Sequence, residues 1–482
     1  ALQAEHIKQR IAQFGGKLYL EFGGKLFDDY HASRVLPGFE PDSKFRMLKT
    51  MVDDVEIIIA INANDIEKSK VRGDLGITYD EDVLRLLDIF RSRGFATSGV
   101  VITHFENQPS AVAFRHRLDS LGIKSYLHYP IAGYPYDTAH IVSDEGYGKN
   151  EFVETTHPLV VVTAPGPGSG KMATCLSQLY HEYKRGVTAG YAKYETFPIW
   201  NLPLKHPVNI AYEAATVDLD DANCIDPFHL EAYGKTTVNY NRDVEIFPVL
   251  KTMMEKIAGE SPYQSPTDMG VNMAGLAIVD DEAVRDAAKM EIVRRYFQAA
   301  VDARRTGLHE EYVERLELLM NQAGIDASFS PARSAALLKE ETTGGPAGAM
   351  VLPDGRVVTG KTSTLLGAAS SLLMNALKAV AGVDEDIFVI KDEVIEPICA
   401  LKTSTLHSKN PRLHSDETLL ALSVSSATDP VAAQLIAHAG DLRGCDAFFS
   451  VILSDTDEKL YRTLGINVCC EPKYEQRRYY HK

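Results

Sequence analysis

The sequence predicts an α/β protein with a mostly parallel, doubly wound domain (P-loop- or Rossmann-like), a helical middle segment and a second, mixed α/β domain. Two observations support this prediction. Short apolar segments alternate with helical patterns up to about residue 260, which is typical of a parallel α/β sheet. Residues 281–323 then carry apolar positions at helical spacing, after which the alternation returns. We expect three parts, at residues 1–260, 261–340 and 341–482.

The expected strands of the first domain are short and apolar. They cover residues 17–22, 55–61, 98–103, 125–129, 159–163 and 191–198. Helices are expected at 81–93 and 110–121, between these strands. Ligands on parallel sheets bind at the carboxyl ends of the strands. Four such ends are polar or glycine-rich, and we expect them to converge on one crevice: 21–24, 62–64, 103–104 and 164–170.

Residues 159–171, LVVVTAPGPGSGK, predict a buried strand, a glycine-rich turn and the start of a helix. Free backbone N–H groups at a helix N-terminus, with the helix dipole behind them, form an anion site. Gly166, Gly168 and Gly170 let the backbone approach a phosphate closely, and Lys171 adds a mobile positive charge. We expect phosphate binding here. The alternative is a tight strand–helix turn with no ligand.

This loop departs from the P-loop pattern G-x-x-x-x-G-K-[ST] at two positions. Pro165 replaces the first glycine, and Met172 replaces the hydroxyl residue that binds Mg²⁺. The nearest hydroxyls are those of Ser169 and Thr174, the latter roughly one helical turn after the lysine. The dinucleotide pattern G-x-G-x-x-G also fails, because Lys171 stands at its last position. These departures weaken the metal site more than the phosphate site.

Residues 355–362, GRVVTGKT, match the P-loop pattern letter by letter, yet we expect no phosphate site there. Their interior is β-branched and belongs in a strand, and residues 353–355 predict a hairpin turn. The first glycine and the lysine would then lie at opposite ends of that strand. Residues 361–364 remain as an expected helix N-terminus with ordinary capping.

Residues 186–250 are rich in charged and polar side chains. Asp218, Asp220 and Asp221 are candidates for holding Mg²⁺ through one or two carboxylates and water. The alternative is a solvated acidic turn. Lys193 and Arg242, together with Lys235, would supply the positive charge that a polyphosphate requires.

The helices expected at 281–305 and 310–323 make residues 281–335 a possible homo-oligomer contact. In the C-terminal domain we expect strands at 349–352, 356–359, 387–390, 419–424, 447–452 and 467–470. Six polar residues there either belong to a surface loop or face the first domain: His407, Asn410, Arg412, His414, Asp416 and Glu417.

Composition excludes several classes of protein. The net charge of −16 argues against nucleic acid as the principal partner, because no basic stripe offsets it. Six cysteines without a C-x-x-C pair indicate neither a disulfide framework nor a structural zinc site. We find no signal-peptide pattern and no apolar run of about 18 residues, so we expect no membrane association and a cytoplasmic location.

Six sequence blocks carry a resemblance to a known family: TAPGPGSGK (163–171), YETFPIWNLPL (194–204), DPFHL (226–230), VNYNRD (238–243), SPTDMGVNM (265–273) and NPRLHS (410–415). The chain resembles, nearly end to end, a bacterial family that contains a domain of unknown function. The resemblance implies the fold but no catalytic residue. Some members have been labelled ATP-dependent peptidases, but this chain contains neither a G-x-S-x-G nor an H-E-x-x-H motif.

By a weaker likeness, the strand, glycine turn and acidic segment are similar to ATP-dependent ligases of the CTP synthase and formyltetrahydrofolate synthetase kind. The sequence thus predicts a ligase or kinase that binds ATP and Mg²⁺ and acts on a small polar metabolite. Lys171 and the 166–170 amides would hold the phosphates, while Lys193 and Arg242 would stabilise the transferring phosphoryl group. One alternative is a non-catalytic sensor or scaffold that binds a phosphorylated metabolite. Another is an enzyme that acts on a sugar phosphate.

Overall fold

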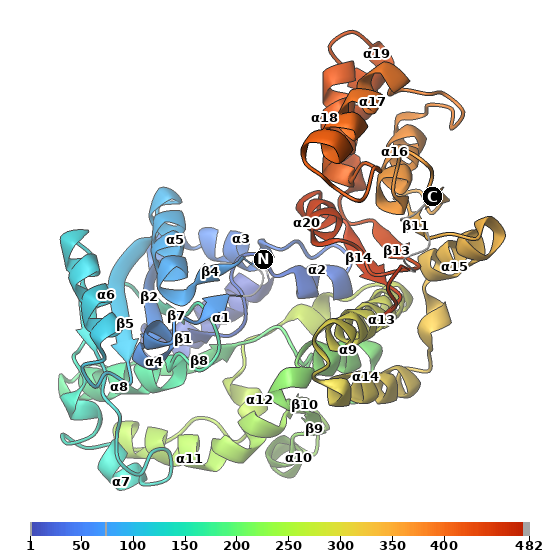
Figure 1. The fold of residues 1–482 in the computed structure, drawn as a ribbon. Coiled ribbons are helices and arrows are strands. Elements are labelled where there is room, and N and C mark those ends of the chain that lie inside the picture. Colours follow the sequence, from blue (N-terminus) through green and yellow to red (C-terminus); the bar gives the residue numbers. More distant parts are fainter. Residues whose placement is uncertain (1, 73–74, 476–482) are drawn as a thin grey trace. The chain divides into compact units, whose positions relative to one another are not determined.

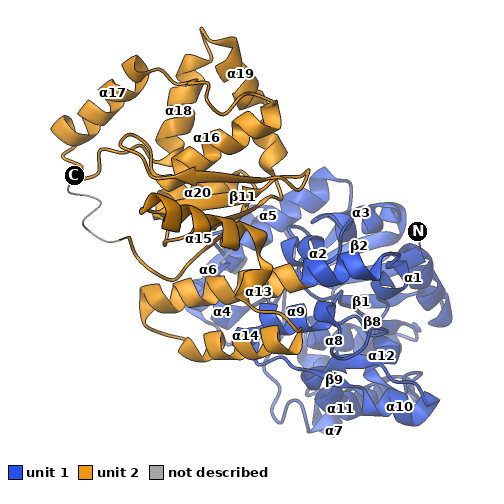
Figure 2. Ribbon diagram, turned by 90° about the vertical axis from the view of Figure 1, so that its right-hand side faces the viewer, with its two compact units in different colours: residues 1–288 blue, residues 289–482 orange. Residues whose placement is uncertain are grey.

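The chain divides into two compact units, residues 1–288 and 289–482, in the computed structural model, which describes residues 2–72 and 75–475 (Figures 1 and 2). The expected α/β fold class is confirmed. The first unit contains a six-stranded parallel sheet, and the second contains a four-stranded mixed sheet.

The strand order of the first sheet is β6-β5-β2-β7-β1-β8. Its strands are β1 (Leu18–Phe22), β2 (Val55–Asn62), β5 (Ala96–Thr103), β6 (Ser125–Leu127), β7 (Leu159–Thr163) and β8 (Gly190–Tyr194). Each lies within or close to an expected segment. The four inner strands are almost entirely buried, which explains why they appear in the sequence as apolar runs without alternation.

Helices cover both faces of this sheet. One face packs against α1 (Leu2–Gln13), α3 (Ser43–Lys49), α5 (Tyr79–Ser92) and α6 (Pro109–Ser120). The other packs against α7 (Thr138–Ile141), α8 (Lys171–Lys184) and α11 (Asn241–Ala258). Successive strand residues alternate between these two cores: Leu20 belongs to the first and Tyr19 to the second.

The connections of the sheet reverse direction between β2 and β7. The crossovers β2–β5 and β5–β6 run through α5 and α6 on the first face, whereas β7–β8 runs through α8 on the second. Adjacent strands whose connections leave to opposite faces open a crevice at their carboxyl ends, where α/β proteins bind ligands. The fold therefore predicts that a ligand binds near the residues that follow β2 and β7.

Smaller elements complete the first unit. They are α2 (Tyr30–Val35), α4 (Ala63–Glu67), α9 (Pro207–Ala215), α10 (Pro227–Tyr233), α12 (Pro266–Met269), the pair β3 (Val71–Arg72) and β4 (Ile77–Thr78), and the pair β9 (Asn223–Ile225) and β10 (Val238–Tyr240).

The second unit is built on a sheet of order β12-β11-β13-β14. Its strands are β11 (Ala347–Val351), β12 (Val357–Lys361), β13 (Asp446–Phe449) and β14 (Asn467–Cys470). Its helices are α13 (Asp281–Thr306, whose first residues belong to the first unit), α14 (Glu310–Gln322), α15 (Pro331–Thr343), α16 (Ala368–Ala381), α17 (Asp392–Ala400), α18 (Ser415–Ser425), α19 (Pro430–Ala437) and α20 (Asp455–Thr463).

The apolar side of α13 is used inside the second unit. The rings of Phe297 and Phe448 lie 4.8 Å apart, and Arg294 binds Asp446 at 2.9 Å. This packing explains the helical spacing of residues 281–305 without a partner chain. The homo-oligomer contact stays a prediction.

Three local expectations for the second unit are wrong. Residues 419–424 lie in α18, where the buried positions follow helical spacing. Residues 387–390 form no strand, since Ile387 and Phe388 are exposed. Residues 361–364 begin no helix, because Lys361 ends β12 and α16 starts only at Ala368.

The expected hairpin is confirmed. Strands β11 and β12 pair antiparallel around the turn at residues 353–355, with Gly355 at φ +84°. Gly355 and Lys361 therefore lie at opposite ends of β12 and cannot surround one phosphate. In the described part of the chain, no helix is long and apolar enough to cross a membrane.

Candidate functional site

The glycine loop at residues 164–170 lies over the carboxyl ends of β2 and β5. Asn62 at the end of β2 donates from Nδ2 to the carbonyl oxygen of Gly168 (3.2 Å). Thr103 at the end of β5 donates from Oγ1 to the carbonyl oxygen of Ser169 (2.9 Å). Three of the four expected strand ends thus meet at the crevice beside β7.

The loop keeps its backbone donors available. Gly168 and Gly170 have φ values of +74° and +81°, and Gly170 is the N-cap of α8. Asn62 on β2 and Thr103 on β5 donate to the carbonyl groups of Gly168 and Ser169. Among the residues that the structure describes, none accepts a hydrogen bond from the N–H groups of Gly168, Ser169 and Gly170. This is the arrangement that an anion requires.

Gly166 is needed for packing. A Cβ atom there would overlap with the hydroxyl group of Tyr79, the first residue of α5. Lys171 is the first residue of α8 and is partly exposed.

The two hydroxyl groups of the expected phosphate site are engaged inside the loop. Ser169 Oγ donates to the carbonyl oxygen of Gly166 (2.8 Å), and Thr174 Oγ1 donates to that of Gly170 (2.9 Å). Both side chains are fully buried. Neither hydroxyl therefore stands where a P-loop presents its metal-binding hydroxyl, after the lysine.

The three aspartates considered for Mg²⁺ lie in different surroundings. Asp218 and Asp220 are exposed, whereas Asp221 is buried and bound by Arg242 through two contacts of 2.6 and 2.8 Å. Within residues 2–72 and 75–475, no three His, Cys, Asp or Glu side chains gather in a metal-binding group. The metal role of the aspartates stays a prediction.

Lys193 belongs to a cluster of charged side chains that we call the acidic–lysine cluster, formed by Glu21, Lys193, Glu195 and Asp243. Lys193 Nζ lies 2.7 Å from both carboxylate oxygens of Asp243 and 3.2 Å from Glu195 Oε1. Glu21 on β1 is in register with Lys193 on β8 and accepts a hydrogen bond from Tyr191 (2.6 Å). Glu21 and Lys193 point to the sheet face that α8 and α11 cover, because Tyr19 and Tyr191, two residues earlier on the same strands, and Val162, the register partner of Glu21, belong to that core.

Burial and mutual charge set the protonation of this cluster. Burial raises the pKa of Glu195 to about 7, against the effect of Lys193 and with that of Asp243 and Glu21. Burial lowers the pKa of Lys193, but Asp243 and Glu195 together hold it above its ordinary value. Lys193 thus stays charged, whereas burial and the neighbouring carboxylates favour the protonated form of Glu195.

Cys175 on α8 lies buried in the core on the same sheet face as Glu21 and Lys193. Burial and the charge of Glu21 raise the pKa of its thiol, while Lys171 lowers it. The acidic–lysine cluster and α8 thus share one face of the sheet, whereas the N-terminus of α8 lies over the ends of β2 and β5.

A cavity of about 50 Å³ adjoins the cluster. Its lining residues are Lys193, Glu195, Phe197, Pro198, Trp200, Val238, Asn239, Asp243, Pro266, Thr267, Gly270 and Asn272. Glu195 lies directly over Gly23, where a Cβ atom would overlap with its side chain. The glycine after β1 thus leaves the space that Glu195 occupies.

Sequence reasoning placed Glu21 at a strand end expected at the crevice, but it gave no site role to Glu21, Glu195 or Asp243. The available signal was a charged residue inside an otherwise apolar strand, as with Glu21 in LYLEF and Lys193 in GYAKY. Of the cations expected to stabilise a phosphoryl group, Lys193 pairs with Asp243 and Arg242 with Asp221. Their role on a phosphoryl group stays a prediction.

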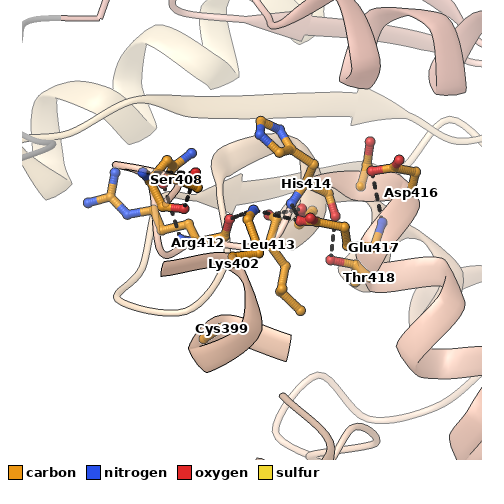
Figure 3. A network of polar contacts seen from close by, with 12 residues as sticks. Cys399, Lys402, Ser408, Arg412, Leu413, His414, Asp416, Glu417 and Thr418 are labelled. Atoms are coloured by element: carbon orange, nitrogen blue, oxygen red, sulfur yellow. Dashed lines mark hydrogen bonds and ion pairs between the residues drawn. The ribbon is translucent and has the colours of Figure 1, made fainter. Parts of the chain in front are cut away.

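The polar residues expected in the second unit mostly form one network (Figure 3). Lys402 donates to the carbonyl oxygen of Arg412 (2.6 Å) and to Glu417 (2.7 Å), as Figure 3 shows. Glu417 also accepts from the backbone N–H of His414, which caps α18. Asn410 and Asp416 accept from backbone N–H groups of Arg412 and Glu417, and His407 is exposed. These contacts hold a surface loop and the start of α18.

Comparisons with known proteins give the family. Residues 1–324 match the model described as "Domain of unknown function DUF1846, N-terminal", and residues 328–480 match its C-terminal counterpart. The chain is 59% identical to UPF0371 protein DIP2346 of Corynebacterium diphtheriae and 56% identical to UPF0371 protein str1377 of Streptococcus thermophilus. Both alignments cover 100% of this chain and 97% of the relative. The resemblance expected from the sequence is confirmed: the chain belongs to the bacterial DUF1846 family of UPF0371 proteins.

Proposed function

We propose that this protein is an enzyme that acts on a small phosphorylated metabolite, whose phosphate binds at residues 164–171. One observation carries the proposal. The carbonyl groups of Gly168 and Ser169 are held by Asn62 and Thr103, which leaves the loop N–H groups available at the N-terminus of a 14-residue helix. Lys171 supplies the positive charge beside them.

The arrangement favours a phosphate site that does not depend on Mg²⁺. Thr174 and Ser169 donate to loop carbonyls, and Lys193 and Arg242 are each paired with a carboxylate. An ATP-dependent ligase or kinase would need these groups for the metal and the transferring phosphoryl group. ATP with Mg²⁺ therefore serves as the competing ligand in the test. The acidic–lysine cluster on the same sheet, in which Lys193 lies between Asp243 and Glu195 and burial raises the pKa of Glu195, favours an enzyme over a non-catalytic sensor or scaffold.

Isothermal titration tests the phosphate site. Glucose 6-phosphate, ribose 5-phosphate and ATP, each with and without Mg²⁺, are titrated into the wild type, Lys171→Ala and Lys184→Ala. Lys184 lies at the other end of α8 and is exposed, so it controls for charge on the same helix. We expect Lys171→Ala to weaken binding at least about 10-fold, the loss of one charge-assisted hydrogen bond, and Lys184→Ala to leave it unchanged.

The outcomes separate the candidates. Unchanged binding by a folded Lys171→Ala variant removes the loop from the function. Magnesium-dependent binding of ATP alone, lost in that variant, supports the ligase or kinase. Binding of a phosphorylated metabolite without turnover supports the sensor or scaffold.

A further inference from the structure

The first unit contains a second, larger cavity of about 450 Å³. It lies among the start of α1, the segment from the end of α2 to α3, residues 273–280 and the first turn of α13. Its walls are mostly apolar and include Leu36, Phe39, Met47, Met273, Ile278 and Val284. At about 30 Å³ for each non-hydrogen atom, this volume takes a molecule of up to about 15 such atoms. Cavities of this size and apolar character commonly bind small molecules.

Tyr194 forms the floor of this cavity, because it is the lining residue that belongs to the sheet. Its side chain is 4% exposed, and its ring packs against that of Phe22 at 4.6 Å between centroids. Within residues 2–72 and 75–475, its hydroxyl group makes no hydrogen bond. Buried tyrosine hydroxyls usually have a partner. The floor of an apolar cavity thus offers one hydrogen-bonding group to a ligand.

The charges around this floor favour an uncharged ligand. Lys44 Nζ lies 6.0 Å from the centre of the Tyr194 ring, but it is paired with Asp29 at 2.7 Å. Asp280, exposed in the lining, adds a negative charge. An anionic group would lose its hydration here without gaining an unpaired cation. Burial and the charge of Asp29 raise the pKa of Tyr194, so its hydroxyl stays protonated and can donate to an uncharged oxygen.

Hydrogen bonds hold the wall at residues 273–280 in place. Gln3 on α1 accepts from the backbone N–H of Met273 (2.8 Å). The carbonyl oxygen of the preceding residue, Asn272, accepts from Trp200 Nε1 (2.9 Å). The cavity is therefore formed before a ligand arrives, which lowers the cost of ordering its walls on binding. Trp200 also adjoins the wall and can report on binding by fluorescence.

We propose that this cavity binds an uncharged, largely apolar molecule of up to about 15 non-hydrogen atoms, whose carbonyl oxygen accepts a hydrogen bond from the Tyr194 hydroxyl. The occupant has to be narrow, because the donor lies on a side chain that is almost completely buried. Its apolar part contacts Met47, Met273 and Ile278, and the fully exposed Val279 lies at the rim. Tyr194 belongs to the core on the sheet face opposite the acidic–lysine cluster, so the proposal does not rest on the phosphate site.

Titration of 2-nonanone and of sodium nonanoate at pH 8 tests the proposal, by calorimetry and by Trp200 fluorescence. The proteins are the full-length wild type, Tyr194→Phe and Tyr30→Phe. Tyr30 is exposed on α2 and serves as the matched control. We expect 2-nonanone to bind the wild type and Tyr30→Phe with a Kd below about 1 mM. Tyr194→Phe should bind it about 5-fold more weakly, the loss of one uncharged hydrogen bond, and nonanoate should bind at least about 10-fold more weakly than the ketone.

Two further variants locate the bound probe. Ala277 lines the cavity and is exposed, so Ala277→Phe should fill the space without disturbing the core and weaken binding of 2-nonanone at least about 10-fold. Lys171→Ala should bind it as the wild type does, whatever becomes of the phosphate site. Tyr194→Phe should keep the wild-type urea midpoint, because the hydroxyl group that it removes holds no other residue.

Four results would overturn the inference. The first is no binding of 2-nonanone by the folded wild type. The second is equal affinity of the wild type and Tyr194→Phe, which would remove the hydrogen bond. Tighter binding of nonanoate than of 2-nonanone would overturn the uncharged class. A dimer that Ala277→Phe dissociates, together with no binding of either probe, would assign this face to a second copy of the chain.

Discussion

His414 links the N-termini of two helices in the second unit. It is the N-cap of α18, and its Nδ1 lies 3.0 Å from Asp457 Oδ2 in the first turn of α20. The buried Asp457 also accepts hydrogen bonds from Ser415 and Ser454. The bond to Asp457 raises the pKa of His414. These partners hold the pKa of Asp457 below its ordinary value although burial raises it.

The pair predicts a pH-dependent stability of the second unit. Because the folded pKa of His414 is raised, its contribution is complete below about pH 6.5, the unfolded value, and is lost as pH rises through the folded pKa. His414→Asn keeps a capping side chain but removes the charge. We expect it to lower the free energy of unfolding by on the order of 1 kcal/mol at about pH 6 and by less at about pH 9. Urea unfolding followed by circular dichroism measures both values.

The exposed His407 supplies the control for this measurement. It lies at φ +54°, a conformation that asparagine tolerates, so His407→Asn should change stability equally little at both pH values. An equal loss for His414→Asn at the two pH values would contradict the role of its charge.

At the scale of an element, a glycine in the loop at residues 164–170 is required either for its left-handed backbone conformation or for close approach of a phosphate. Alanine variants of Gly168 and Gly186 distinguish these two requirements. Gly168 in the loop and Gly186 after α8 have φ values of +74° and +76°, and a Cβ atom at either would meet nothing within 4 Å. Alanine at each position therefore causes the same backbone strain, about 1 kcal/mol, without a clash. We expect both variants to lose similar stability in urea unfolding. Only Gly168→Ala should weaken binding of the phosphorylated probe in titration, and equal affinities would argue against close approach at residue 168.

The elements also show what local sequence can predict. Strands β7 and β14 have the bounds expected from their apolar residues, because buried strands need continuous apolar runs. Residues 419–424 are too short a run to distinguish a strand from a helix. The capping contacts of His414 and Glu417, which start α18, decide for the helix.

The candidate site likewise contains residues that the local sequence predicts and residues that it does not. Residues 164–171 were predictable because strand, turn and helix follow one another in the chain. The acidic–lysine cluster was not, because the strand order β7-β1-β8 and helix α11 assemble it from residues up to 222 positions apart, Glu21 to Asp243. Pairing between distant strands leaves no local pattern.

At the scale of the whole molecule, the two units have separate hydrophobic cores and give different spectroscopic signals. The single tryptophan, Trp200, lies in the first unit, whereas both units contribute helices to circular dichroism. A ligand stabilises only the unit that binds it, by about 2.7 kcal/mol at 100 times its Kd. We expect a bound phosphorylated ligand to raise the urea midpoint of Trp200 fluorescence and to leave a second dichroism phase in place. A single transition that shifts as a whole by both methods would show that the units unfold together.

In strands β1 and β8, successive side chains point to opposite faces of the sheet. Glu21 and Lys193 belong to the acidic–lysine cluster, whereas their neighbours Phe22, Ala192 and Tyr194 belong to the core on the opposite face. A paired replacement of Lys193 and Asp243 can therefore alter chemistry while the neighbouring residues preserve packing, whereas loss of Lys193 alone leaves the carboxylates without their cation. For evolution, or for an engineer, this sheet edge is a place where a new activity can be tried without first rebuilding the scaffold.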